Sequence, residues 1–311
     1  MIIGDVMVDS YLWGSVDRIS PEAPVPVVAV EKRASRLGGA ANVALNVNAL
    51  GAKAIPCAVI GQDVRGEEFR QLLKKRNISD EGIIESKYRS TTTKFRVIGN
   101  NTQMLRVDEE STDKLNQEEQ AQFLERCKKV LRKQRPHVII FEDYDKGLIT
   151  EEVIDRIIQW AAELNIPVVS DPKRNNFLHY HNLALFKPNL KELKEGLKLN
   201  KLDAFKEIEK AIFKIQDQQS HDLVMVTLSE NGVMLSDGQE IFRIPAHYRS
   251  IADVSGAGDT VISVAALCLA QQVDRRTIAA LSNLAGGLVC EHVGVVPVNK
   301  EQFLTEAKRL L

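Results

Sequence analysis

The stretch Asp253-Val-Ser-Gly-Ala-Gly-Asp259-Thr260 is a glycine-rich loop that ends in a carboxylate. Small and apolar residues follow it from Val261 to Ala270, which is typical of a buried helix. This order predicts that the loop leads into the amino terminus of the helix, where unpaired backbone N–H groups carry partial positive charge. Gly256 and Gly258 would let an anion approach that backbone closely. The stretch therefore predicts an anion-binding turn.

Asp259 has two interpretations, because a carboxylate at this position repels an anion that merely rests there. In the first, Asp259 is a catalytic base that deprotonates an incoming hydroxyl group beside the anion-binding turn. The backbone N–H groups of Gly256, Ala257 and Gly258 would then hold the charge that develops during the reaction. In the second, Asp259 caps the helix, which is a common role for aspartate. The local sequence alone favours neither interpretation.

The rest of the chain alternates predicted helices and strands, which indicates an α/β fold. Repeated strand–helix units favour a mostly parallel central sheet with helices on both faces. Strands are predicted at residues 2–9, 54–60, 138–141, 168–171, 184–187, 223–227, 232–236 and 241–244. Helices are predicted at 40–50, 65–76, 117–133, 151–164, near 190, and at 203–216, 256–271, 275–292 and 300–310.

Two segments depart from this alternation and predict a small β lid. Residues 10–35 contain Pro21, Pro24 and Pro26 among several valines, and proline is typical of edge strands and extended segments. Residues 91–98 and 103–108 have strand character, and the intervening Gly-Asn-Asn is a hairpin signal. We predict a single domain over residues 1–311, with a lid contributed by about 10–35 and 88–108.

Composition excludes several classes of function. The chain has 311 residues, 44% of them hydrophobic and 27% charged, as in ordinary globular proteins. A net charge of −1 gives no general attraction to nucleic acid or to an anionic membrane. The scattered cysteines at 57, 127, 268 and 290 favour reduced thiols over disulfides or a zinc site. With no apolar run of the roughly 18–20 residues that span a bilayer and no signal peptide, a cytoplasmic location is expected.

Polar clusters follow several of the predicted strands. In parallel sheets, ligands bind beyond the carboxyl ends of the strands. One charged cluster is usually a solvated loop, but several at one rim of a sheet predict a ligand site. The clusters are Asp5 with Asp9, residues 142–147, Asp171 with Lys173, residues 187–192, and residues 227–232.

Ordered motifs in the chain resemble the signature of the PfkB (ribokinase-like) carbohydrate kinases over nearly its whole length. The motifs are Gly38-Gly39-Ala-Ala-Asn42, Asn189-x-x-Glu192, Thr227-x-Ser229-x-x-Gly232 and Asp253-x-x-Gly-Ala-Gly-Asp259. Residues 4–9, 17–27, 93–94 and 103–108 are similar to the kinase domain of D-glycero-β-D-manno-heptose 7-phosphate kinases. The resemblance implies a ribokinase-like fold and ATP-dependent phosphorylation of the sugar at O1, a step towards ADP-heptose for lipopolysaccharide core. It also implies Mg²⁺ and a homodimer.

The resemblance also implies roles for individual residues. Asp259 would be the base, and Glu192 would steer a hydrated Mg²⁺ ion, although Asn189 and Glu192 also fit a helix-capping box. The nucleotide would be bound by Asn189, Leu190, Lys191, Glu192, Thr227, Ser229, Gly232 and Asn283. The sugar would be bound by Asp9, Gly38, Gly39 and Asn42, and its 7-phosphate by Lys94, Arg96, Arg106, Lys146 and Lys173. Each lysine taken alone is more often a solvated surface residue, and Asn283 is nearly as well explained as a buried helical asparagine.

The sequence is also compatible with other functions. A fructokinase or ribokinase of the same fold would not require basic residues on the lid. A sensor of sugar phosphates or nucleotides without catalytic activity is a further alternative, which the intact Asp259 and glycine loop disfavour. No H-x-G-H motif is present, since His292 lies in His-Val-Gly-Val, so no nucleotidyltransferase domain is expected. Because Gly4 and Asp5 follow only three residues, either the first strand is short or native residues precede Met1.

Overall fold

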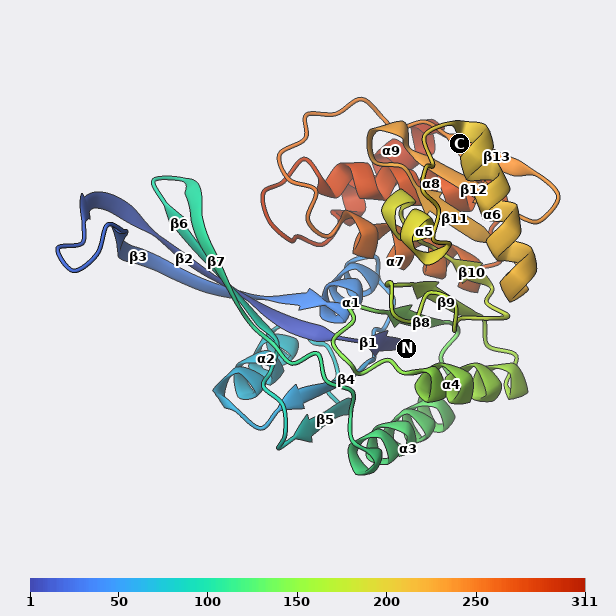
Figure 1. Ribbon diagram of the computed structural model, residues 1–311. Coiled ribbons are helices and arrows are strands. Elements are labelled where there is room, and N and C mark those ends of the chain that lie inside the picture. The colour runs from blue at the N-terminus through green and yellow to red at the C-terminus, as the bar shows by residue number, and fades with distance from the viewer. Residues whose placement is uncertain (311) are drawn as a thin grey trace.

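A nine-stranded sheet in the order β13-β12-β11-β10-β9-β8-β1-β4-β5 forms the centre of this computed structural model, which describes residues 1–310 (Figure 1). All neighbouring pairs are parallel except β11–β12 and β12–β13. Its strands are β1 (Ile2–Gly4), β4 (Pro56–Gly61), β5 (Gly82–Ser86), β8 (Ile139–Glu142), β9 (Val168–Asp171), β10 (Leu185–Phe186), β11 (Val224–Thr227), β12 (Val233–Ser236) and β13 (Ile241–Ile244). The predicted mostly parallel α/β fold is confirmed. The last residue of the predicted domain, Leu311, lies outside the described residues.

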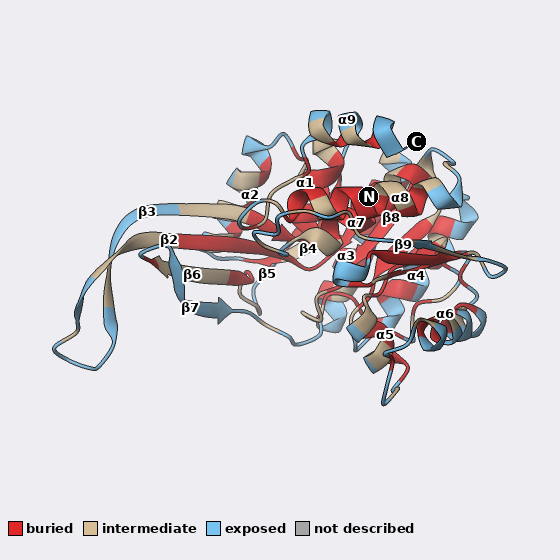
Figure 2. Ribbon diagram, turned by 90° about the horizontal axis from the view of Figure 1, so that it is seen from above, coloured by how far each residue is buried: buried red, intermediate tan, exposed pale blue. Residues whose placement is uncertain are grey.

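Helices cover both faces of this sheet, as Figure 2 shows from above. Central strands such as β8 and β9 are therefore buried along their whole length. On one face α1, α7 and α8 pack against one another, while α3, α4 and α6 lie on the other. The helices are α1 (Ala40–Ala49), α2 (Val64–Lys75), α3 (Gln117–Gln134), α4 (Glu151–Glu163), α5 (Leu190–Gly196), α6 (Phe205–Gln219), α7 (Ala257–Ala270), α8 (Arg275–Val289) and α9 (Lys300–Leu310).

Two glycines with positive φ start the helices that form the site. Gly256, at φ 79°, is the N-cap of α7, and Gly39, at φ 59°, is the N-cap of α1. Residues with a side chain rarely adopt this backbone conformation, whereas glycine does so readily, and the chain can therefore turn sharply into each helix. Because α1 and α7 are packed together, the starts of these two helices lie side by side.

A second, four-stranded sheet projects from the body, as the long blue and green ribbons in Figure 1 show. In it β2 pairs with β3 and β6 with β7 antiparallel, while β2 and β6 are parallel. The order is β3-β2-β6-β7, with β2 (Val6–Ile19), β3 (Pro26–Gly39), β6 (Thr93–Gly99) and β7 (Thr102–Glu109). The strands fall in and around the segments for which the sequence predicts a lid.

Two details of the predicted strands were wrong. A single strand was predicted over residues 2–9, but β1 ends at Gly4 and β2 begins at Val6 in the other sheet. Asp5 causes this division, because its N–H donates to the Glu142 carbonyl while its own carbonyl accepts from Ala40. The edge strand β5 was not predicted at all.

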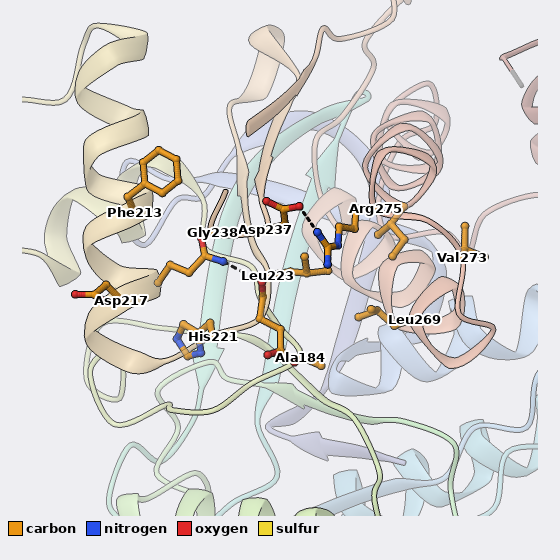
Figure 3. A pocket seen from close by; sticks show the side chains of 13 residues that line it. Ala184, Phe213, Asp217, His221, Leu223, Asp237, Gly238, Leu269, Val273 and Arg275 are labelled. Carbon is orange, nitrogen blue, oxygen red and sulfur yellow. Dashed lines mark hydrogen bonds and ion pairs between the residues drawn. The ribbon is translucent and has the colours of Figure 1, made fainter. Parts of the chain in front are cut away.

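A cavity of about 700 Å³ lies at the amino ends of the parallel strands (Figure 3). Its lining includes Ala184 just before β10 and Leu223 just before β11, together with Gly238 in the β12–β13 turn. Ligands of open parallel sheets bind at the opposite, carboxyl ends. This cavity is therefore distinct from the rim where the sequence motifs gather. Within residues 1–310, no helix combines the length and apolar character that a bilayer span requires.

Candidate active site

Asp259 is the third residue of α7, and its buried carboxylate accepts two hydrogen bonds. Asn42 donates from Nδ2 to Oδ2 over 2.7 Å, and Tyr144 donates from Oη to Oδ1 over 2.8 Å. Burial raises the pKa of Asp259, and these two hydrogen bonds partly oppose that increase. The helix-cap interpretation is wrong, because Gly256 is the N-cap and no side chain caps α7. The carboxylate points instead towards α1 and the loop after β8.

Tyr144 was missed as a functional residue, although it lies in one of the polar clusters noted in the sequence. Its backbone N–H donates to Asp5 Oδ2 over 3.0 Å, and the N–H of Lys146 donates to the same oxygen over 3.1 Å. Burial, followed by the charge of Asp259, raises the pKa of Tyr144 well above its usual range. The phenol therefore stays protonated and remains a donor to Asp259.

The glycine loop faces a charged cluster. A Cβ added to Gly258 would lie 3.5 Å from Asp171 Oδ2 and 3.7 Å from Lys187 Nζ, so this backbone is within contact distance of the cluster. A Cβ on Gly256 would lie 2.8 Å from Asn42 Nδ2, the same amide that holds Asp259. A side chain at Gly256 would thus disturb the amide that positions Asp259, and one at Gly258 would lie against the charged cluster.

Two lysines and two carboxylates make up this charged cluster at the ends of β9 and β10. Lys187 is fully buried and its Nζ lies 2.8 Å from Asp171 Oδ2. Lys173 Nζ lies 2.6 Å from Glu192 Oε1 and 3.5 Å from Asp171 Oδ1. Burial is the largest single influence and acts to lower the pKa of each lysine, but the charges of Asp171 and Glu192, together with hydrogen bonds to these carboxylates, outweigh it and raise both pKa values. The cluster therefore keeps two positive charges beside the open backbone of Gly258.

Glu142, the last residue of β8, is a buried acid beside the same cluster. Neither of its carboxyl oxygens has a hydrogen-bond partner among residues 1–310. Burial, with the charges of Asp171 and Asp259, raises the pKa of Glu142 well above its usual range. A neutral Glu142 adds no repulsion to the site.

The predicted nucleotide residues lie along the next strand ends. Asn189 and Glu192 form the capping box of α5, with both hydrogen bonds at 2.8 Å, and Leu190 and Lys191 occupy its first turn. Asn189 also bridges Thr227 at the end of β11. The capping interpretation is thus confirmed, and it orients the Glu192 carboxylate towards Lys173.

Ser229 and Gly232 follow β11 in a short 3₁₀ turn. Both have positive φ, 51° and 85°, which explains why glycine would suit the position of Ser229. Asn283 on α8 donates from Nδ2 to the Pro245 carbonyl over 2.8 Å. That contact ties down the segment after β13 and agrees with the interpretation of Asn283 as a hydrogen-bonded helical asparagine.

The predicted sugar residues lie where the second sheet joins the body. Gly38 faces the Asp9 carboxylate across the β2–β3 pair, and a side chain at Gly38 would collide with it. Asp9 forms an ion pair with Arg96. Gly39 begins α1, and Asn42 is the α1 residue that holds Asp259. Asp9, the glycines and Asn42 are therefore brought together.

One face of the second sheet carries most of its positive charge, and we call it the cationic face. Residues paired across strands point to the same side, and side chains alternate along each strand. The register therefore places Arg36 and Lys94 beside Asp9, and Arg96 beside Tyr11 and Arg106. The cationic face contains Lys32, Arg36, Lys94, Arg96 and Arg106, with Asp9, Tyr11, Trp13 and Asp108 among them.

Lys146 and Lys173, two of the predicted phosphate-binding cations, form ion pairs away from the cationic face, whereas Arg106 forms its ion pair on it. Lys146 Nζ pairs with Glu110 Oε1 over 2.7 Å, and Lys173 pairs with Glu192. Arg106 is exposed and pairs with Asp108 over 2.9 Å. In this conformation Lys173 belongs with the carboxylates at the strand ends, whereas Lys94, Arg96 and Arg106 belong to the cationic face.

Similarity to known proteins agrees with this geometry. Two bifunctional HldE proteins match 97% and 96% of the chain: that of Desulfatibacillum aliphaticivorans at 39% identity and that of Campylobacter curvus at 37%. The matches cover 62% and 63% of those two proteins, so the chain spans less than two thirds of their length.

Solved structures share the fold at low sequence identity. Escherichia coli phosphofructokinase-2 in complex with potassium superposes with a TM-score of 0.83 at 20% identity, over 100% of this chain and 98% of that one. Thermotoga maritima ribokinase gives 0.69 at 18% identity, over 98% of each chain. The sequence profile described as pfkB family carbohydrate kinase matches residues 1–302. This chain, with Asp259 at the start of α7 beside the glycine loop, therefore belongs to the pfkB family of carbohydrate kinases.

Proposed function

We propose that this protein transfers the γ-phosphoryl group of ATP to O1 of D-glycero-β-D-manno-heptose 7-phosphate. The observation that carries the proposal is the cationic face, which meets the sugar-side residues Asp9 and Gly38. A neutral sugar has no use for several cations at that point, whereas a sugar phosphate requires them. The heptose is favoured because relatives named HldE match nearly the whole chain and because the lid segments resemble heptose 7-phosphate kinases. The product would be the 1,7-bisphosphate, a precursor of ADP-heptose for lipopolysaccharide core.

Asp259 acts as the base in this mechanism. Its carboxylate takes the proton from the O1 hydroxyl as that oxygen attacks the γ-phosphorus, and the bond from γ-phosphorus to the bridging oxygen of ADP breaks. Asn42 and Tyr144 fix the direction of the carboxylate before the sugar arrives. Its raised pKa makes Asp259 a stronger base than a solvated aspartate.

Backbone N–H groups and buried lysines stabilise the transferred group. Phosphoryl transfer depends mainly on positioning and on neutralising charge at the equatorial oxygens. The backbone of Gly258 lies beside Asp171 and Lys187, so an anion held there would meet a positive charge. The Ala257 N–H donates to the Val254 carbonyl over 3.3 Å, which leaves the N–H groups of Gly256 and Gly258 as the donors that we propose for the anion. The nucleotide would lie along the ends of β10 and β11, beside Asn189, Thr227, Gly232 and the first turn of α5.

The residues fit a Mg²⁺ ion that travels with the nucleotide. Among residues 1–310 no three histidine, cysteine or acidic side chains are grouped as a metal cage. Mg²⁺ commonly keeps several waters and uses few protein ligands besides phosphate oxygens, so the oxygen of Glu192 is a suitable outer ligand. When bound, the ion supplies positive charge against the phosphates. Lys173 donates to one oxygen of Glu192, and this contact with a positive charge supports the proposal that the carboxylate steers a hydrated cation.

A substrate comparison tests the proposal directly. We expect kcat/KM for heptose 7-phosphate to exceed that for fructose or ribose by at least about 100-fold, since each charged hydrogen bond to a phosphate contributes roughly 1.5–3 kcal/mol. ADP release with each sugar at matched ATP concentration measures this ratio. Faster turnover of the neutral sugars would reject the heptose in favour of a fructokinase or ribokinase activity. Binding of ATP and sugar phosphate without turnover would favour a sensor.

Tyr144→Phe should move the pH dependence of turnover. The phenol stabilises the ionised form of Asp259, so its removal raises the pKa of the base. We expect the acidic limb of the kcat profile to move to higher pH and kcat near neutrality to fall by about 10-fold, the effect of one hydrogen bond to a charged group. Tyr88→Phe, at an exposed tyrosine, is the control. An unmoved limb would show that Tyr144 does not act on the base.

We also propose that the second sheet is a lid that mediates a homodimer. Leu105 and Val107 on β7 are exposed, and their partners Val97 and Phe95 place them on the face opposite the cationic face. A second copy would cover this apolar face and pair the open edge strands. Light scattering at micromolar concentration should report a dimer that Leu105→Lys dissociates, and a monomeric wild type would refute this assembly.

A further inference from the structure

Arg36 is a half-buried arginine on the cationic face without a counter-ion. It lies two residues before Gly38, and its strand partner Asp9 pairs with Arg96 instead. Among residues 1–310 no carboxylate oxygen lies within 4.0 Å of the Arg36 guanidinium. Its polar contact is the Val295 carbonyl, 3.3 Å from Nη1. A partly buried positive charge with so little compensation is costly unless an anion joins it.

Tyr11 lies beside two guanidinium groups, those of Arg36 and Arg96. The Cζ atoms of Arg36 and Arg96 lie 5.0 Å and 5.2 Å from the centre of its ring. Cation–π attraction stabilises each group there, and Tyr11 is in turn stacked on Trp13 at 5.2 Å. Like charges gathered at one ring repel each other, and an anion with several oxygens relieves that repulsion. Arginine forks match phosphate oxygens in pairs, so phosphate is the ligand that this arrangement suits best.

The opposite wall of this site belongs to the body of the protein. Gly294 has φ 76°, and a Cβ there would lie 2.9 Å from Arg36 Nη1, so the glycine makes room for the guanidinium. The Gly294 N–H donates to Asp253 Oδ2 over 2.8 Å, and Asp253 Oδ1 accepts from Ser255 over 2.9 Å. Arg36 therefore contacts the turn that also holds the start of the catalytic glycine loop. A ligand at Arg36 would lie between the second sheet and that loop.

We propose that Arg36 is a specificity-determining residue that binds the phosphate group of the acceptor sugar together with Arg96. The inference rests on the proposed function, in that the acceptor is a sugar phosphate, and it adds the residue that selects for the phosphate. Arg96 forms an ion pair with Asp9, the carboxylate for which we propose contact with the sugar hydroxyl groups. Arg36 has no carboxylate partner of this kind, so its charge is available to the phosphate group. Lys94 and Arg106 contribute longer-range attraction from the same face.

Kinetics with matched variants test this assignment. Arg36→Met keeps the aliphatic stem and removes the charge, and Arg33→Met is the control, because Arg33 is exposed on the opposite face of the same strand. Each variant is assayed with heptose 7-phosphate, heptose and fructose 6-phosphate, and its thermal midpoint is measured. For Arg36→Met we expect kcat/KM for the best phosphorylated sugar to fall about 10–100-fold, mostly through KM. Turnover of unphosphorylated heptose should stay within about two-fold of wild type.

The outcomes separate this inference from the proposed function. An equal loss for phosphorylated and unphosphorylated heptose, or no loss at all, would overturn the role of Arg36 while leaving the heptose 7-phosphate kinase activity in place. A wild type that prefers fructose 6-phosphate, with a selective loss in Arg36→Met, would overturn the heptose and retain Arg36. Arg36 would instead have a structural role if Arg36→Met lowered the thermal midpoint and Arg36→Lys restored it. In that case Arg36→Lys would also restore turnover of phosphorylated and unphosphorylated heptose to the same extent.

Discussion

Asp259→Asn should lower kcat by about 10²- to 10⁴-fold, the range that a positioned general base contributes. Asparagine preserves the shape of the side chain and can still meet the Nδ2 donor of Asn42 and the phenol of Tyr144. It cannot accept the proton of the sugar hydroxyl. ATP affinity, measured by calorimetry, should stay near the wild-type value, because in the proposed mechanism Asp259 acts on the sugar hydroxyl and does not contact the nucleotide.

A matched control distinguishes a lost base from a disturbed helix. Asp274→Asn makes the same chemical change at the N-cap of α8, where asparagine caps as well as aspartate. Its turnover and unfolding free energy should match the wild type. If Asp259→Asn retained wild-type turnover, another group would have to take the proton, and Asp259 would lose the role of base.

Lys187→Met should destabilise the fold by about 3–5 kcal/mol, because it leaves the buried Asp171 carboxylate with an incomplete set of partners. Lys187 is almost fully buried and contacts Asp171 at 2.8 Å, while Lys173 is further away at 3.5 Å. Urea unfolding measures the loss. Turnover should also fall, since the same lysine places positive charge beside Gly258.

The double variant Lys187→Met/Asp171→Asn shows whether the charge left behind is the cause. Removing both charges should recover much of the stability but not the turnover, because a buried ion pair costs more to break than to replace. Lys201→Met is the surface control: Lys201 and Asp203 form an exposed pair at 3.3 Å, which contributes at most about 1 kcal/mol. Equal losses for the single and double variants would mean that packing, not charge, explains the effect.

Much of the fold follows from local sequence signals. The strand at 168–171 and the helix starting after Gly39 are predicted almost to the residue, because apolar runs bounded by glycine or polar caps specify them. The division at Asp5 is not predictable in this way. It depends on hydrogen bonds to Glu142 and Ala40, which are distant in sequence. Strand β5 was not predicted because Gly82–Ser86 is short and shows no alternation of apolar and polar residues.

For the site, motifs identify residues but not their partners. The glycine loop and Asp259 stand out in the sequence, and Asn189 with Glu192 form the expected capping box. Tyr144 and Arg36 have no comparable signal. Their proposed roles depend on contacts between distant segments: Tyr144 reaches Asp259 across 115 residues, and Arg36 reaches Val295 across 259. Such contacts depend on how α1, α7 and the second sheet pack, which no local pattern encodes.

The parallel pairing of β2 with β6 has a consequence for how the chain folds. Val8 aligns with Thr93, so the whole of β3, α1, β4, α2 and β5 lies between the paired strands. Closing so long a loop carries an entropic cost that local contacts must first offset. We expect the β2–β3 hairpin to form early and its docking to β6 to come late, after the adjoining half of the central sheet has assembled. Nascent chains would then spend their longest interval with the edge of β2 unprotected, which makes this strand the point most prone to misassembly.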